Sequence, residues 1–245
     1  MNAPIVIEND SFQNCWIESI KFLPNNSWEC WNFIINIRNP ILFDNNINNA
    51  VTTFARSNGL ILPKHVAYTI FPHKQYKNNK RVKVLYDRYN NRFYPWTRKR
   101  PHRGWGTYFY RMIHYEKNMT IVNQLDNIIK SINSRIRTSK ACYNILIQKP
   151  GTETIRIRGG PCLNYIAVQM EPGKNRRMSL LCVYRNHDFL ERTYGNYWGI
   201  CNLLKFLAKE TNSIIGTLTC ISSHAYISAK KTELNQFLRS IDEAT

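Results

Sequence analysis

The clearest structural pattern in the chain is PCLNYIAVQMEPGKNRRMSLLCVYRNHDFLERTYGNYWGICNLLKFLAK, residues 161–209. Two runs within it, 162–170 and 178–185, are rich in β-branched and aromatic residues and flank the turn-forming EPGKN. This pattern predicts two strands joined as a hairpin. Farther along, residues 196–209 are predicted to form a helix, because apolar side chains recur there at helical spacing, at Ile200, Leu203, Leu204 and Leu207.

Similar patterns extend to both sides of this stretch. Helical spacing of apolar residues predicts further helices at 121–136 and 232–241. Short β-branched or aromatic runs predict further strands at 81–86, 143–148 and 214–222. Helices and strands that are interspersed without strict alternation indicate the α+β class, in which helices pack on a mixed sheet.

The composition is that of one folded domain covering residues 1–245. Hydrophobic residues make up 43% and charged residues 20% of the chain, which is enough to bury a core and too mixed for disorder. No run of about 18 apolar residues occurs, and the N-terminal MNAPIVIENDSF lacks the pattern of a secretory leader. We therefore expect a soluble, cytoplasmic protein that has no membrane partner.

The seven cysteines are scattered at wide intervals, without a C-x-x-C pair or a Cys/His cluster. This spacing predicts neither a disulfide framework nor a metal site, and most such cysteines are small buried hydrophobic residues. Cys162 differs from the others because it follows RIRGG, residues 156–160, at the start of a predicted strand. Neighbouring arginines can lower the pKa of a thiol and so favour its reactive form.

Positive charge is concentrated in the basic aromatic segment, residues 72–111. The chain has 34 Lys and Arg against 16 Asp and Glu, a net charge of +18. The segment alone holds twelve basic residues, ten aromatic residues and the single acid Asp87. Charge interleaved with rings is typical of surfaces that neutralise phosphates and stack bases, so the segment is a candidate nucleic-acid-binding surface. The alternative is a solvated basic face whose tyrosines belong to the core.

Several polar motifs follow Cys162 in a fixed order. PCL at 161–163 precedes RNHD at 185–188, then Asn196 eight residues after the aspartate, and finally SHAY at 223–226. In order and approximate spacing these motifs resemble the thymidylate synthase superfamily, which includes the pyrimidine hydroxymethylases. The family pattern is P-C-H, R-S-x-D, an asparagine eight residues later, and A-H-x-Y. The resemblance covers roughly 125–227.

GWGTYFYR, residues 104–111, is also similar to the tyrosine-glycine-tryptophan-arginine region of that family. The resemblance implies a homodimer packed through its sheets and a one-carbon transferase, which adds a methyl or hydroxymethyl group to C5 of a uracil nucleotide such as dUMP. It implies Cys162 as the nucleophile that adds to C6, which makes C5 nucleophilic, and Tyr110 as a second catalytic residue. It also implies 5,10-methylenetetrahydrofolate as the cofactor, with Asp188 holding its pterin.

The resemblance further implies the residues that bind the nucleotide: Arg185, Asn186, Asn196, His224, Tyr226, Arg137 and Lys140. Arg185 would bind the phosphate. Asn196 offers a donor and an acceptor that match the O4/N3–H edge of uracil, whereas the family uses aspartate there for cytosine. His224 and Tyr226 alternate on a strand and would contact the sugar hydroxyl, and Arg137 and Lys140 are candidates for the basic pair lent to the neighbouring subunit.

The chain also departs from the family pattern. Leu163 replaces its histidine, Asn186 its serine and Arg192 its glycine, and neither the E-L-x-W-F-L helix that carries its glutamate nor its apolar C-terminal tail is found. Two other functions therefore stay open. One is a nucleotide- or nucleic-acid-binding descendant that has lost catalysis. The other is an enzyme that applies the same C5 chemistry to a pyrimidine within RNA or DNA.

Overall fold

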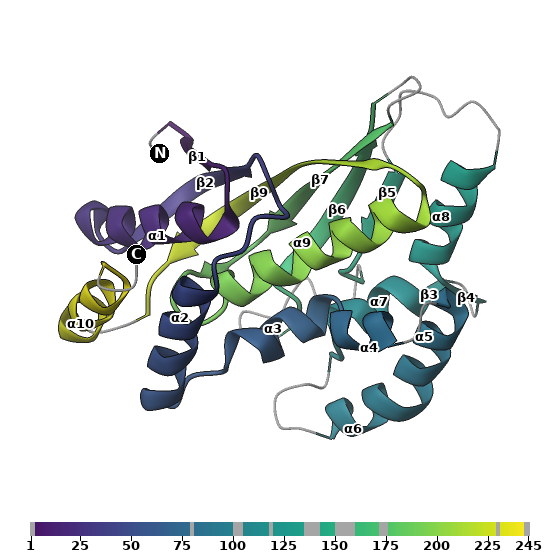
Figure 1. Cartoon of the computed structure of the whole chain (residues 1–245), viewed down its shortest axis with the longest axis horizontal. Helices are drawn as coiled ribbons and strands as arrows, with labels where there is room; N and C mark the ends of the chain where they lie inside the picture. The colour runs from purple at the N-terminus through teal and green to yellow at the C-terminus, as the bar shows by residue number, and fades with distance from the viewer. Residues whose placement is uncertain are drawn as a thin grey trace.

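The computed structural model describes residues 3–78, 81–99, 105–117, 120–134, 143–149, 160–171, 176–228 and 231–242. A mixed sheet crosses the molecule (Figure 1). In the described part of the chain it has seven strands, of which six lie in the order β1 (Ile5–Asn9), β2 (Glu29–Ile37), β9 (Ile214–Tyr226), β7 (Arg177–Tyr184), β6 (Leu163–Met170) and β5 (Tyr143–Leu146). The seventh, β8 (His187–Asp188), pairs with the end of β9.

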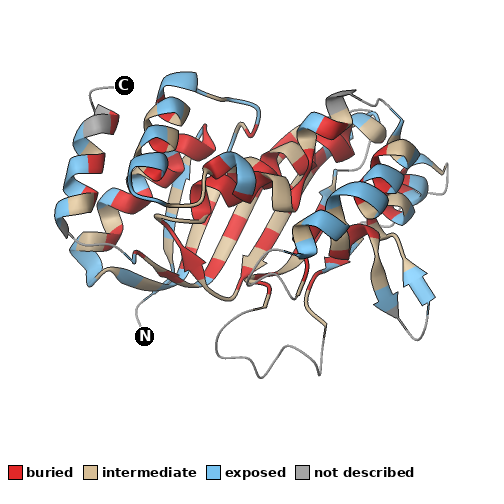
Figure 2. Cartoon of the chain, turned by 90° about the horizontal axis from the view of Figure 1, so that it is seen from below, coloured by how far each residue is buried: buried red, intermediate tan, exposed pale blue. Residues whose placement is uncertain are grey.

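The helices lie on one side of this sheet (Figure 2). Two of them, α1 (Phe12–Phe22) and α9 (Thr193–Glu210), pack against the strands and against each other. The others are α2 (Asn45–Ser57), α3 (Pro63–Ile70), α4 (His73–Asn78), α5 (Val82–Arg88), α6 (Tyr94–Arg98), α7 (Tyr108–Ile113), α8 (Gln124–Asn133) and α10 (Lys231–Asp242). A single π turn, Tyr89–Phe93, joins α5 to α6, a 3-10 turn (Leu23–Asn26) follows α1, and the small hairpin β3–β4 (Tyr115–Lys117 and Thr120–Val122) follows α7.

The predicted hairpin and the long helix after it are confirmed. Strands β6 and β7 pair antiparallel, from Leu163 opposite Tyr184 to Met170 opposite Met178. Helix α9 begins three residues before the predicted start at Asn196. The predicted strands at 143–148 and 214–222 and the helix at 232–241 are also present, as β5, β9 and α10. The sheet with its packed helices agrees with the α+β class.

Two predicted elements need correction. Residues 81–86 do not form a strand but begin helix α5, because Leu85, Tyr86 and Tyr89 are neighbours on one helical face that is buried in the core. The helix predicted at 121–136 begins only at Gln124, since Ile121 pairs with Glu116 in the small hairpin. Asn123 then caps α8 by accepting the backbone N–H of Asp126.

Helix α3 crosses α9 at very short range, and this contact places α3 beside the candidate site. A Cβ atom added at Gly195 would lie 2.5 Å from Cβ of Val66, and one at Gly199 would lie 2.8 Å from the carbonyl oxygen of Ala67. Only glycine leaves room for such an approach between two helices. The sequence carried no separate signal for this packing.

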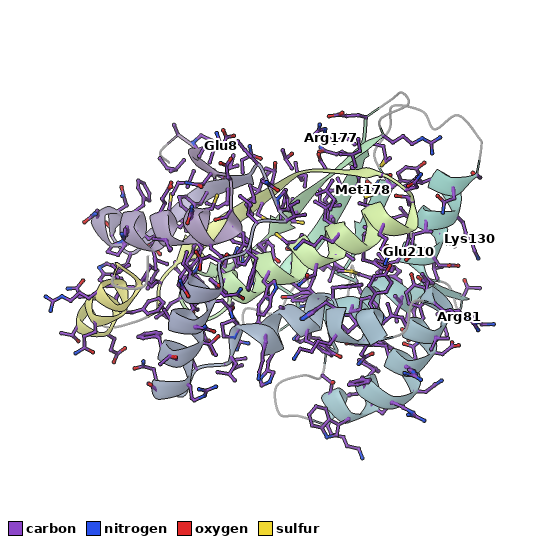
Figure 3. All side chains as sticks on the ribbon, in the orientation of Figure 1. Glu8, Arg81, Lys130, Arg177, Met178 and Glu210 are labelled. Atoms are coloured by element: carbon purple, nitrogen blue, oxygen red, sulfur yellow. The ribbon has the colours of Figure 1, made fainter. Side chains whose placement is uncertain are left out.

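The basic aromatic segment folds as a helical layer from α4 to α7. Tyr86, Tyr89 and Tyr108 belong to the core, whereas Phe93 and Trp96 are exposed. The described charged side chains of the segment are exposed, apart from Arg111, which donates to the carbonyl oxygens of Trp105 and Ile147 and is buried. Figure 3 shows Arg81 and Lys130 at the outer edge of the molecule. Among the described residues, no helix has the length and hydrophobicity needed to cross a membrane.

Candidate active site

A cavity of about 410 Å³ lies where the ends of the sheet strands meet the start of α9 and the side of α3. Helix α3 contributes Val66 and Thr69, the segment before α7 contributes Trp105, and the first residue of α7 contributes Tyr108. Six residues from the motifs that follow the basic segment also line the cavity, namely Cys162, Asn186, His187, Asp188, Asn196 and Tyr226. The structure therefore brings five of the ten predicted site residues together at one cavity, although these five span more than sixty positions of the chain.

Cys162 stands immediately before β6, at the wall of this cavity. Its backbone N–H donates to the hydroxyl of Tyr108 at 3.2 Å, and its carbonyl oxygen accepts the backbone N–H of Arg185 at 2.9 Å. Burial raises the pKa of the Cys162 thiol, while the positive charges of Arg185 and Arg192 act to lower it. Burial also raises the pKa of Tyr108 to about 12, so that its hydroxyl keeps its proton at neutral pH.

Arg185 and Arg192 supply the two positive charges that act on the thiol. The Nε of Arg185 donates to the carbonyl oxygen of Pro161 at 3.2 Å, and a Cβ atom at Gly160 would lie 3.8 Å from its guanidinium nitrogen. Arg185 therefore braces the loop before Cys162, while Gly160 itself lines the cavity. Arg192 lines the cavity directly and forms an ion pair with Glu191 at 3.3 Å. This second arginine stands where the family pattern has glycine.

Asn196 is held by a buried chain of hydrogen bonds. Its amide nitrogen lies 3.0 Å from Nε2 of His187, whose Nδ1 lies 2.9 Å from the hydroxyl of Ser222. Burial lowers the pKa of His187 to about 3, so the ring is neutral at pH 7 and has one donor and one acceptor nitrogen. Since Nε2 accepts from the amide of Asn196, Nδ1 carries the proton and donates to Ser222. The Oδ1 atom of Asn196 has no partner among the described residues, and the side chain lines the cavity.

His224 and Tyr226 come from the end of β9. Their rings stack at 5.3 Å, and Tyr226 lines the cavity. The imidazole of His224 lies beside the cavity, between the amide oxygen of Asn186 at 3.2 Å and the carboxylate of Glu29 at 3.0 Å. It also stacks on the exposed ring of Trp31, at 4.5 Å. His224 therefore reaches the cavity through Asn186, which does line it.

The carboxylate of Asp188 holds the turn that leads into α9. Its Oδ1 accepts the backbone N–H groups of Leu190 and Glu191, at 3.0 and 3.1 Å, and its Oδ2 accepts the hydroxyl of Ser228. Both oxygens of this buried side chain are thus already bonded within the protein. An ionised carboxylate offers about four accepting positions, and Asp188 lines the cavity, so one accepting position of Oδ2 is still available to a ligand.

Of the predicted site residues that the structure describes, Tyr110, Arg185 and His224 do not line the cavity. Tyr110 stacks on Tyr94 with ring centroids 3.4 Å apart and does not line it, whereas Tyr108, two positions earlier, does. Arg137 and Lys140 lie outside the described residues.

Sequence reasoning also missed residues that line the cavity. Tyr108, His187 and Arg192 were inside or beside the quoted motifs, so their positions carried a signal. Val66 and Thr69 carried none, because they reach the cavity only through the packing of α3 on α9.

Comparison with known proteins supports a distant similarity to thymidylate synthases. The chain is 27% identical over 124 residues, 49% of its length, to a protein of Methanocaldococcus jannaschii named "Putative thymidylate synthase". It is 26% identical over 106 residues, 43% of its length, to a protein of Methanosarcina barkeri with the same name. The aligned parts cover 54% and 46% of those relatives, so the chain spans about half the length of the curated relatives it matches. No protein-family model matches the chain. The relationship to thymidylate synthases is therefore a distant one.

Proposed function

We propose that the chain is a thymidylate synthase-like enzyme, which binds a uracil nucleotide and activates C5 of the base through an adduct between Cys162 and C6. The observation that carries this proposal is the presence of Cys162 and Asn196 in one cavity, with the amide of Asn196 oriented by His187. The accepting Oδ1 can take the N3–H of uracil, and the second amide hydrogen can be donated to O4.

The residues at the cavity support exchange of the C5 hydrogen, a reaction that needs only water as a co-reactant. The Cys162 thiol gives its proton to water, and the thiolate forms a bond to C6 while the electron pair of the C5–C6 double bond moves toward C5 and O4. A donor at O4 stabilises the resulting enolate. C5 then takes a proton from water. Loss of the other C5 hydrogen as a proton, followed by release of the thiolate, restores the base with its C5 hydrogen exchanged.

One-carbon transfer to the activated C5 is the reaction that the resemblance favours, and the names of the two relatives agree with it. The product would be a methylated or hydroxymethylated uracil nucleotide. The cavity residues described above account for the steps up to the activated C5.

We also propose that the working unit is a homodimer that packs through the face of the sheet opposite the helices. One row of neighbouring residues crosses six strands on that face: Val6, Ile34, Ile221, Val183, Tyr165 and Leu146. All six are at least partly exposed. A sheet face that met water would be mostly polar, so this apolar row favours a covering partner, and a second copy is the partner that the resemblance implies.

Exchange of tritium from C5 of labelled dUMP into water tests the nucleophile without a one-carbon donor. We expect the wild type to release tritium and Cys162→Ser to release it at the uncatalysed rate. Cys201 is buried in the core, and Cys201→Ser is the matched control. The folded Cys201→Ser protein should release tritium at the wild-type rate. If Cys162→Ser exchanges as fast as the wild type, Cys162 is not the nucleophile.

Mass spectrometry after incubation with 5-fluoro-dUMP shows whether the adduct forms and whether it needs folate. A mass increase of one nucleotide, located at Cys162, supports the adduct. An adduct that forms only with methylenetetrahydrofolate would show that folate binds at this site. Binding of 5-fluoro-dUMP without adduct or exchange would favour the alternative that the chain binds nucleotides and has lost catalysis.

A further inference from the structure

A second cavity, of about 350 Å³, lies on the other side of α3. Its walls come from α3, from the start of α4 and from the π turn and α6 of the basic aromatic segment. Lys64 and Lys74 supply positive charge at its edge, and both are exposed. Among its lining residues in the described part of the chain there is no aspartate or glutamate.

Aromatic rings supply the rest of the recognition surface in this second cavity. Tyr68 and Phe93 lie with their centroids 6.1 Å apart, and Trp96 is 60% exposed at the cavity wall. An exposed tryptophan beside lysines offers a flat face on which a base can stack while its phosphate is neutralised. The chemistry of the cavity therefore fits a flat ring that carries negative charge.

The two cavities are neighbours. Thr69 lines both of them, and Thr107, which lines the second, directly precedes Tyr108, which lines the first. The hydroxyls of Tyr89 and Thr107 are 2.7 Å apart, so the wall between the cavities is itself hydrogen-bonded. Two ligand groups, one in each cavity, would be separated only by one face of α3 and by the segment of Thr107 and Tyr108.

We propose that the second cavity binds the nucleotide next to the target pyrimidine, so that the substrate is a pyrimidine within a single-stranded nucleic acid. This inference rests on the proposed function, because it requires a pyrimidine in the first cavity. Its support is the positive charge of the segment that supplies Phe93 and Trp96 to the second cavity. Along α5, the π turn, α6 and their ends, this segment carries the exposed side chains of Arg81, Lys83, Arg88, Arg92, Arg98 and Lys99, far more positive charge than one nucleotide phosphate needs.

Binding to a labelled single strand of about twelve nucleotides, with one uracil, tests the proposal by fluorescence anisotropy. We expect the wild type to bind this strand at least about tenfold more tightly than dUMP. Trp96→Ala should weaken binding of the strand about tenfold, through the lost stacking, and leave dUMP affinity unchanged. Replacing Lys64 and Lys74 by glutamine should reduce the log–log salt slope by about 0.7 for each lysine that neutralises a phosphate.

Lys130→Gln is the matched control, because Lys130 is exposed on α8 at the outer edge of the molecule and does not line the second cavity (Figure 3). The proposal is overturned if Lys130→Gln weakens binding of the strand as much as Lys74→Gln does. Positive charge anywhere on the surface would then have the same effect, and the second cavity would not be a specific binding site. It is overturned equally if the strand binds no more tightly than dUMP.

A competing occupant is an aromatic dicarboxylate such as p-aminobenzoylglutamate, the tail of folate. Binding of this compound that depends on Trp96, with no gain in affinity for the strand over dUMP, would assign the cavity to a one-carbon donor and overturn the proposal. These measurements involve no chemistry at C5. A failure of tritium exchange with intact strand binding therefore contradicts the proposed reaction and leaves the nucleic-acid site standing.

Discussion

At the scale of single residues, base selection depends on two side chains and not on one. Asn196 can present either its oxygen or its nitrogen to a base, and these two edges recognise opposite patterns of donors and acceptors. The neutral ring of His187 accepts from the amide nitrogen and so leaves Oδ1 available to the base. The proton is then on Nδ1, where the hydroxyl of Ser222 accepts its hydrogen bond.

Asn196→Asp should change the base preference from uracil to cytosine. A carboxylate cannot donate to O4 of uracil, but it can accept from the amino group of cytosine. The mismatch costs roughly 1–3 kcal/mol, about ten- to a hundredfold in affinity. The carboxylate also requires a donor at Nε2 of His187, so the ring should change tautomer. Calorimetry with dUMP and dCMP measures the first effect and ¹⁵N NMR of the imidazole the second, and equal affinity of the wild type for both bases would contradict the assignment.

The burial of His187 predicts a pH dependence of stability. Its pKa is about 3 in the folded protein, against 6.5 for the unperturbed group. Between these values the unfolded chain binds a proton that the native state does not, so stability falls as the pH decreases from 6.5 toward 3, by at most about 1.4 kcal/mol per pH unit from this residue.

Urea unfolding of His187→Gln at pH 7.5 and pH 5.0 tests this dependence. We expect the wild type to lose about 2 kcal/mol more than this variant between the two pH values. His65 is exposed on α3, and His65→Gln should behave as the wild type does. An identical pH response of the wild type and His187→Gln would show that the ring is not held neutral by burial.

At the scale of elements, the decisive contact is the crossing of α3 over α9. Gly195 and Gly199 lie on the face of α9 that α3 covers, and α3 brings Val66 and Thr69 to the cavity. Alanine is ordinarily about 1 kcal/mol more favourable than glycine inside a helix. The structure reverses that expectation at Gly195, because the added Cβ would meet both the Val66 side chain and, at 2.7 Å, the carbonyl oxygen of Pro63.

Gly195→Ala is therefore expected to destabilise the protein by about 1–3 kcal/mol, as overpacking does. It should also weaken dUMP binding, since α3 must move away from the cavity. Chemical denaturation and calorimetry measure the two effects. Thr53→Ala on the exposed face of α2 serves as the control and should be neutral or slightly stabilising. Stabilisation by Gly195→Ala would show that the two helices are not in close contact.

The elements also show where sequence patterns predict structure and where they do not. The hairpin β6–β7 and helix α9 were predictable, because the same residues that favour each element locally also form its buried face. Residues 81–86 were misread, since Val82 and Val84 favour a strand while the packing of Leu85 and Tyr86 favours a helix. The parallel pairing of β1 with β2 joins segments more than twenty residues apart and left no local pattern.

At the scale of the whole molecule, the apolar row on the open sheet face predicts self-association. Val183 lies near the middle of this row, between Ile221 and Tyr165. Sedimentation equilibrium should give a mass twice the 28.9 kDa of one chain. Val183→Arg should give the single-chain mass, because a charge cannot be buried without a partner. Ser131→Arg, exposed on α8, is the control that should remain a dimer. A wild type of single-chain mass at micromolar concentration would contradict the proposed dimer.

The central hairpin, the helix that follows it, the excess of positive charge and the order of the Cys162, Asn186, Asp188 and Asn196 motifs could all be derived from the amino-acid sequence. These features are local, because they depend on side-chain periodicity and spacing along the chain. The folded structure was needed to show that Tyr108 and not Tyr110 meets the cavity, that His187 orients Asn196, and that Asp188 holds the turn into α9. These outcomes depend on which elements pack together, and packing is set by contacts between residues far apart in the sequence, where local patterns carry no information.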